Sequence, residues 1–310
     1  MHDLGLIGER AEQAASHLEH CQLCPRKCGV NRLAGQVGFC GIGFRARVFS
    51  HGPHFGEEAA LVGKKGSGAI FFSGCNLQCV FCQNFDISMA QKNGSVQGDE
   101  LTSRELAAIM LQLQEQGCAN INLVTPSHVV PQILAALQEA VSLGLHIPLV
   151  YNTSSYDRVK TLRLLDGIIQ IYMPDCKVYS EDKAARYLQA KDYPSVMRAA
   201  VAEMHRQAGD LLCDERGQAV RGLVVRHLVM PGMAEETGAI MRFLAEKISP
   251  ETFVNVMDQY HPGHRADDYP EINRCLESRE FEQAMRVARK AGLHRFERRN
   301  IGRLLALLTR

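Results

Sequence analysis

Residues 69–84 read AIFFSGCNLQCVFCQN, a short apolar run that leads directly into Cys75, Cys79 and Cys82. Five more runs of this kind follow along the chain, separated by longer segments with helical periodicity. They are INLVTP (121–126), PLVYNT (148–153), IIQIYMP (168–174), LVVRHLVM (223–230) and FVNVMDQ (253–259). This alternation predicts βα units around a parallel sheet. Six units are too few to close an eight-stranded barrel, so the expected fold class is α/β, a partial (β/α)6 barrel.

Three of the intervening segments have the pattern of amphipathic helices, and each ends in a glycine that suits a helix C-terminus. They are SRELAAIMLQLQEQG (103–117), VPQILAALQEAVSLG (130–144) and YPSVMRAAVAEMHRQAG (193–209). Functional residues of parallel sheets gather beyond the carboxyl ends of the strands. We therefore expect function among the polar residues and cysteines that follow each apolar run.

The composition excludes several classes of protein. The chain has 310 residues, and the 46% that are hydrophobic argue against disorder. The formal charge of +1 argues against a strong overall charge that would attract nucleic acid or a membrane surface. No segment has the length of a signal peptide core or a membrane span, so we expect a cytoplasmic protein without membrane contact. Eleven cysteines in that compartment indicate metal binding rather than a disulfide framework.

The C-x3-C-x2-C spacing of Cys75, Cys79 and Cys82 supplies three thiolates on one loop. Iron–sulfur clusters normally have four protein ligands, and an open coordination position is what catalysis at a metal requires. Phe81, between two of these cysteines, suits an apolar shell over a cluster. A three-cysteine zinc site completed by a histidine, or cysteines spaced by chance, remain alternatives on spacing alone.

This motif, with an aromatic residue just before its last cysteine, resembles the radical S-adenosylmethionine (SAM) superfamily. Over roughly residues 18–293 the chain is also similar to the branch named after pyruvate formate-lyase activating enzyme, in particular its PflX-like members. The stretches that carry this likeness are CQLCPRKCGVNRLAGQVGFCG, GSGAIFFSGCNLQCVFCQN, NINLVTPSH, YNTSSY, IYMPDCK, VRHLVMPG and VMDQYHP. The resemblance implies a 4Fe-4S cluster whose open iron binds SAM, and a 5'-deoxyadenosyl radical that abstracts hydrogen from a substrate.

The resemblance also assigns roles to residues at the strand ends. Asp175 and Lys177 look like the Asp-x-Lys of the branch, and Asp175 with Met173, Asn152 and Thr153 is similar to a monovalent-cation site beside the SAM carboxylate. An aspartate usually stands in the position of Asn152, so a cation here would have one carboxylate fewer.

The Gly-Gly-Glu that receives the SAM amino group in the family is replaced here by Thr125, Pro126, Ser127 and His128. Their hydroxyls and imidazole offer equivalent hydrogen bonds, while Ser127 and His128 equally suit ordinary capping positions. Ser154 is expected either to contact the ribose or to cap. Arg226 and Gln259, near His227, Asn255, Tyr260 and His261, lie where the substrate or the adenosyl group would be met.

A second cysteine group, Cys21, Cys24, Cys28 and Cys40, supplies four thiolates in a glycine-rich segment. Four ligands suit either a closed structural zinc site or an auxiliary iron–sulfur cluster, and cysteine count does not separate the two. We expect an N-terminal segment with this four-cysteine lobe (1–66), the partial barrel (67–293) and a basic tail (294–310). Residues 286–310 carry eight Lys or Arg and one acid, Glu297, which is typical of a solvated amphipathic helix and leaves an RNA or acidic protein partner open.

The leading interpretation is an oxidoreductase of the radical SAM type, supplied with electrons by a donor such as flavodoxin or ferredoxin. The family name suggests a protein substrate that receives a glycyl radical, and a small molecule or RNA stays open. The alternative class is a non-catalytic iron–sulfur or zinc protein or an electron carrier. A carrier would need neither a SAM pocket nor a barrel.

Overall fold

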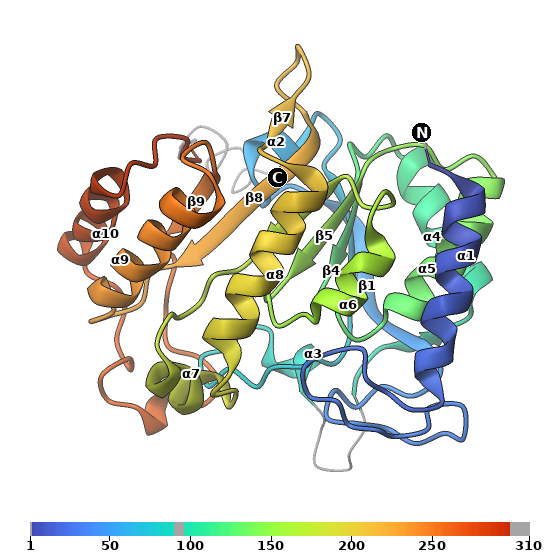
Figure 1. Cartoon of the computed structure of the whole chain (residues 1–310), viewed down its shortest axis with the longest axis horizontal. Helices are drawn as coiled ribbons and strands as arrows, with labels where there is room; N and C mark the ends of the chain where they lie inside the picture. The colour runs from blue at the N-terminus through green and yellow to red at the C-terminus, as the bar shows by residue number, and fades with distance from the viewer. Residues whose placement is uncertain (1, 90–95, 298–310) are drawn as a thin grey trace.

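The computed structural model describes residues 2–89 and 96–297, and its centre is a row of six parallel strands (Figure 1). In spatial order they are β2 (Ser67–Phe72), β4 (Ile121–Val124), β5 (Leu149–Thr153), β6 (Ile171–Pro174), β8 (Ala219–Leu228) and β9 (Phe253–Met257). Each of the six apolar runs therefore supplies one parallel strand. The neighbours of β2 are β1 and β4, so the row does not close on β9, and the predicted partial (β/α)6 barrel is confirmed.

Three further strands extend the row with antiparallel pairs. β1 (Ala46–His54) lies between β2 and the short β3 (Asp99–Leu101), and β7 (Leu212–Cys213) pairs with β8. The register of β1 against β2 shifts between Val48 and Ser50, which marks a bulge in this strand.

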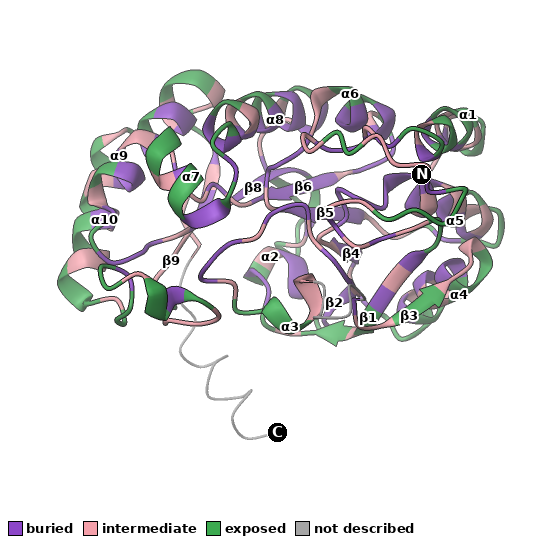
Figure 2. Cartoon of the chain, turned by 90° about the horizontal axis from the view of Figure 1, so that it is seen from below, coloured by how far each residue is buried: buried purple, intermediate pink, exposed green. Residues whose placement is uncertain are grey.

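Most of the helices lie on the outside of the curved row of strands, as the view from below shows, whereas the short α2 (Ala59–Val62) lies on its inner side, where Leu61 packs with Ile171 and Met173 (Figure 2). They are α1 (Leu4–Ala15), α2 (Ala59–Val62), α3 (Phe85–Ser88), α4 (Ser103–Glu115), α5 (Val130–Ser142), α6 (Val159–Leu162), α7 (Glu181–Leu188), α8 (Tyr193–Ala208), α9 (Ala234–Phe243) and α10 (Ser278–Lys290). The 3-10 turns are η1 (Ser16–Leu18), η2 (Arg163–Leu165) and η4 (Ala266–Asp268), and η3 (Leu244–Ile248) is π-helical. None of the described helices reaches the length and apolarity that a membrane crossing requires.

The three predicted helices are α4, α5 and α8. A capping box starts α4: the Thr102 hydroxyl accepts the Glu105 amide at 3.2 Å, and the Glu105 carboxylate accepts the Thr102 amide at 2.8 Å. Gly209 ends α8 with φ of 73°, a conformation in which a side chain would be strained. Local sequence chemistry therefore sets both kinds of helix end.

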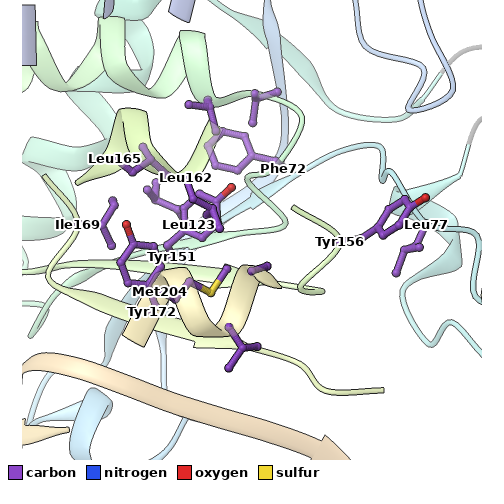
Figure 3. Packing of buried hydrophobic residues seen from close by; sticks show 14 of the residues in the cluster. Phe72, Leu77, Leu123, Tyr151, Tyr156, Leu162, Leu165, Ile169, Tyr172 and Met204 are labelled. Carbon is purple, nitrogen blue, oxygen red and sulfur yellow. The ribbon is translucent and has the colours of Figure 1, made fainter. Parts of the chain in front are cut away.

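The core between strands and helices is apolar and includes buried tyrosines whose hydroxyls form hydrogen bonds. Tyr151 on β5 and Tyr172 on β6 pack edge to face, 5.8 Å between ring centroids, and Leu162, Leu165, Ile169 and Met204 lie near them (Figure 3). Tyr151 donates to Asp157 at 2.9 Å, and Tyr172 donates to Gln207 on α8. These bonds let large aromatic rings be buried without leaving a polar atom unpaired.

The N-terminal segment shares this framework. Helix α1 packs against α5, and β1 belongs to the main sheet beside β2. The predicted boundary at residue 66 thus falls between two paired strands. Of the predicted basic tail, residues 298–310 lie outside the described residues.

Candidate functional site

A cavity of about 520 Å³ opens at the carboxyl ends of the parallel strands. Twelve of the residues singled out from the sequence line it: Cys75, Cys79, Cys82, Thr125, Asn152, Thr153, Ser154, Asp175, Lys177, Arg226, Asn255 and Gln259. They come from all six strand ends, from β2 to β9. Because parallel strands present their carboxyl ends on one edge, residues up to 184 positions apart in the chain meet here.

The cysteine loop begins where β2 ends. Gly74 has φ of 77°, and a Cβ at this position would lie 2.3 Å from the carbonyl oxygen of Cys40, so a glycine is needed for the turn into the loop. The Leu77 amide then donates to the Cys75 sulfur at 3.3 Å, and the Cys82 amide donates to the Cys79 carbonyl at 3.1 Å. The chain thereby curls the three cysteines around one side of the cavity.

Burial is the largest cause that raises the pKa of the Cys75 thiol, to about 11, and it raises the pKa of Cys79 further; nearby cysteines add to both shifts. The charge of Lys177 opposes both shifts without overcoming them. Thiols in such a place become thiolates when a metal binds them, because the metal takes the place of the proton. Three sulfur donors on one short loop fit an iron–sulfur cluster with one iron left open.

Asp175 and Lys177 form an ion pair beside the cysteines, with 2.6 Å between the Lys177 ammonium and the Asp175 carboxylate. Burial lowers the pKa of Lys177, but the charge of Asp175 and the nearby Cys79 and Cys82 raise it above its ordinary value. The Tyr193 hydroxyl donates to the carbonyls of Ser154 and Asp175 at 3.0 and 2.9 Å. A charged pair is therefore held rigidly at the end of β6, facing the cavity.

The end of β5 presents a hydroxyl-rich wall. Thr153 donates to the buried Asp157 at 2.6 Å and is 3.0 Å from the Ser127 hydroxyl. The Ser154 hydroxyl is buried and has no partner among the described residues.

Two residues of the cavity region have the left-handed backbone that favours glycine. Thr125, in the cavity wall, has φ of 60°, and Ser155 has φ of 65°. A β-branched residue in this conformation costs about 1–2 kcal/mol. Such strain is commonly kept at functional sites, where it orients a side chain.

Four of the predicted cofactor-binding residues lie outside the cavity lining. Phe81 is buried and packs edge to face on Tyr260, 6.2 Å between centroids, beside a smaller cavity that also touches Asp175 and Lys177. Met173 lies in a buried apolar cluster with Ile171, since both face the barrel interior.

Ser127 and His128 are also turned into the interior. Ser127 binds Thr153, and His128 is fully buried with its Nε2 2.8 Å from the Ser73 carbonyl. Burial lowers the pKa of His128 to about 4, so the ring is neutral at pH 7. These two residues hold the strand ends together; Thr125 is the member of the Thr-Pro-Ser-His segment that reaches the cavity.

The structure adds a charged cluster around Arg226 that the sequence did not predict. Glu58 binds the Arg226 guanidinium with two bonds of 2.7 Å, Glu57 pairs with the same guanidinium, and His54 lies 3.1 Å from Glu57. Asn255 donates to Glu58 at 2.8 Å. The two glutamates follow β1, an antiparallel strand outside the six βα units, so only their adjacency in sequence could have drawn attention to them.

The four N-terminal cysteines belong to a segment that contacts the start of the loop carrying Cys75, Cys79 and Cys82. Cys21, Cys24 and Cys40 are buried and Cys28 is exposed, and the Cys40 carbonyl packs on Gly74. Within residues 2–89 and 96–297, no three Cys, His, Asp or Glu side chains form a preformed single-ion site.

The fold and the cavity define an α/β protein with an open (β/α)6 barrel and a cysteine-lined site at the carboxyl ends of its strands. No family model matches the sequence. The chain is 32% identical over 293 residues to "Uncharacterized protein MJ0674" of Methanocaldococcus jannaschii, covering 93% of this chain and 80% of that protein. The chain belongs to the same family as that archaeal protein.

Several solved structures are partly similar. Streptococcus suis SuiB bound to precursor peptide SuiA matches 76% of this chain and 48% of that chain, with 12% identity and a TM-score of 0.48. Native anSMEcpe with bound AdoMet matches 72% of this chain and 61% of that chain, with 9% identity and a TM-score of 0.47. The chain thus spans between about half and three fifths of these structures. The likeness is partial at these scores.

Proposed function

We propose that this protein is a radical SAM enzyme, in which Cys75, Cys79 and Cys82 hold a 4Fe-4S cluster. The observation that carries the proposal is the convergence of these three cysteines with Asp175, Lys177 and the β5 hydroxyls on one cavity. Three thiolates, rather than four, leave one iron free for a ligand from the cavity. An electron carrier would have no use for a polar cavity on that side of its cluster.

A cluster bound here would supply the single electron that cleaves SAM to methionine and a 5'-deoxyadenosyl radical, which takes a hydrogen atom from the substrate. The chain's own residues bind and orient SAM. Lys177, held by Asp175, offers a positive charge beside the cysteines for the SAM carboxylate. Asp175 and Asn152 are the residues that would hold a monovalent cation next to it.

The adenosine half of SAM is assigned to the rest of the wall. Ser154 and Thr125 offer hydroxyls, the first of them unpartnered, and Arg226 with Gln259 closes the far side of the cavity. Arg226 is occupied by two carboxylates and so acts as a fixed platform more than as a free cation.

The finer assignment is a pyruvate formate-lyase activating enzyme-like oxidoreductase of the cytoplasm that draws electrons from flavodoxin or ferredoxin and acts on a protein partner. It is supported by the sequence motifs alone. A small molecule or RNA substrate is the competing assignment, and substrate identity is separate from SAM cleavage.

The test is anaerobic reconstitution with iron and sulfide, followed by dithionite and SAM and an assay for 5'-deoxyadenosine. We expect wild-type protein to form 5'-deoxyadenosine and Cys79→Ala to form none. Cys275→Ala, which removes an exposed isolated cysteine, is the matched control and should behave as wild type. Retention of full cleavage in Cys79→Ala, or its absence from wild-type protein with a fully loaded cluster and substrate added, would contradict the proposal.

A further inference from the structure

The four N-terminal cysteines converge although they span 20 positions of the chain. A tight turn follows Cys24, in which the Lys27 amide donates to the Cys24 carbonyl at 3.1 Å. Backbone bonds between Cys21 and Val30 (3.0 Å) and between Gly29 and Cys21 (2.9 Å) close the first three cysteines into a tight loop. Gly38, whose added Cβ would lie 3.0 Å from the Cys28 sulfur, lets the returning chain bring Cys40 close.

A backbone amide points at one of these sulfurs. The Phe39 amide donates to Cys28 at 3.4 Å. The cavity loop has the same kind of contact, from the Leu77 amide to the Cys75 sulfur at 3.3 Å. A thiol is a weak acceptor and a thiolate a strong one, so this arrangement is built for metal-bound sulfur.

A buried positive charge lies against one of these sulfurs. Arg32 is only 2% exposed; its Nη2 donates to the Cys40 sulfur at 3.4 Å and its Nη1 to the His128 carbonyl at 2.8 Å. No carboxylate within the described part of the chain forms an ion pair with it. A buried guanidinium without a counter-charge costs several kcal/mol, and Cys40 as a thiolate would supply that charge.

We propose that Cys21, Cys24, Cys28 and Cys40 bind a second metal centre as four thiolates, with Arg32 as the buried counter-charge that positions Cys40. The inference does not depend on SAM chemistry at the first site. Arg32 reaches His128, which in turn binds Ser73 at the end of β2, so the centre braces the start of the catalytic cysteine loop. Its ligand chemistry fits zinc or an iron–sulfur cluster, and the experiment separates the two.

The first measurement uses a full-length variant in which Cys75, Cys79 and Cys82 are all alanine, so that only the second centre can hold metal. Purified without oxygen, it should contain about one zinc without sulfide, or about four irons with sulfide. Adding Cys24→Ser should remove that metal. A triple variant with neither metal, or metal that survives Cys24→Ser, overturns the proposal.

The role of Arg32 is tested by release of the metal to a chelator. Removing a side chain that supports a ligand typically weakens metal binding about 10- to 100-fold, so Arg32→Gln should lose metal that much more readily, and Arg32→Lys less so. Arg10→Gln is the control, because this guanidinium donates to Gln13 on α1 at 3.0 Å instead of to a sulfur.

Circular dichroism separates loss of the centre from loss of the fold. Sulfur-to-metal charge-transfer absorption, read on the iron–sulfur cluster or on cobalt(II) put in place of zinc, provides a second readout. That band should shift in Arg32→Gln and not in Arg10→Gln. Metal release and absorption unchanged in a folded Arg32→Gln variant would show that Arg32 is not the counter-charge.

Discussion

The ion pairs of Arg226 with Glu57 and Glu58 should contribute several kcal/mol to the free energy of unfolding, and Glu58→Gln tests this. The Glu58 side chain is fully buried and supplies two of the bonds to Arg226 as well as the acceptor for Asn255. Glutamine keeps the shape but leaves Glu57 as the remaining anion against the guanidinium. Breaking a buried pair costs about 3–5 kcal/mol, and we expect about 3 kcal/mol because Glu57 stays.

That loss converts into a measurable melting shift. Unfolding entropy is about 2.1 cal/mol/K per residue, or about 0.65 kcal/mol/K for a chain of this length, so Tm should fall by about 5 °C. Glu282→Gln is the control: Glu282 pairs with Arg286 at 3.7 Å, and both side chains are about two-thirds exposed. Exposed pairs contribute at most about 0.5 kcal/mol, which predicts a shift below about 1 °C. Equal shifts for the two variants in thermal melts would refute the reasoning.

Two further predictions concern pH and backbone strain. Burial alone would raise the pKa of Glu57, but the charge of Arg226 and the bond from His54 hold it at about 2, below its ordinary 4.5. The stability that Glu57 supplies is therefore complete above about pH 4.5 and lost as pH falls through about 2. The urea midpoints of wild type and Glu57→Gln should differ most at pH 7, differ less at pH 3 and converge near pH 2; a constant difference contradicts this. Because Thr125 has φ of 60°, Thr125→Gly should melt about 2 °C above Thr125→Ala, while both bind SAM more weakly than wild type. Equal melting temperatures of the two variants would show that backbone strain at Thr125 does not affect stability.

Much of the fold is determined locally. Each parallel strand follows from a run of apolar residues, as INLVTP becomes β4, and helix ends follow from caps such as Thr102 with Glu105. The spacing of Cys75, Cys79 and Cys82 likewise indicated cluster chemistry, because ligands on one loop are close in space whatever surrounds them.

The sequence predicted that residues at the strand ends line the site, but it did not predict which of their side chains face the cavity. Asn152 and Ser154 face the cavity, whereas Met173 and His128 are absorbed into the interior. Which of two adjacent polar residues faces a cavity depends on strand register and on the turn that follows, and a single sequence specifies neither strongly.

By itself the sequence determined the six βα units and the two cysteine groups, because periodicity and ligand spacing act over a few residues. Only the tertiary structure placed Glu58 against Arg226, 168 positions away, and Arg32 between Cys40 and the carbonyl of His128. A buried charge pairs with a group that is near it in the folded core, because the low dielectric there makes an unpaired charge costly. The distance between two residues along the chain does not predict such pairs.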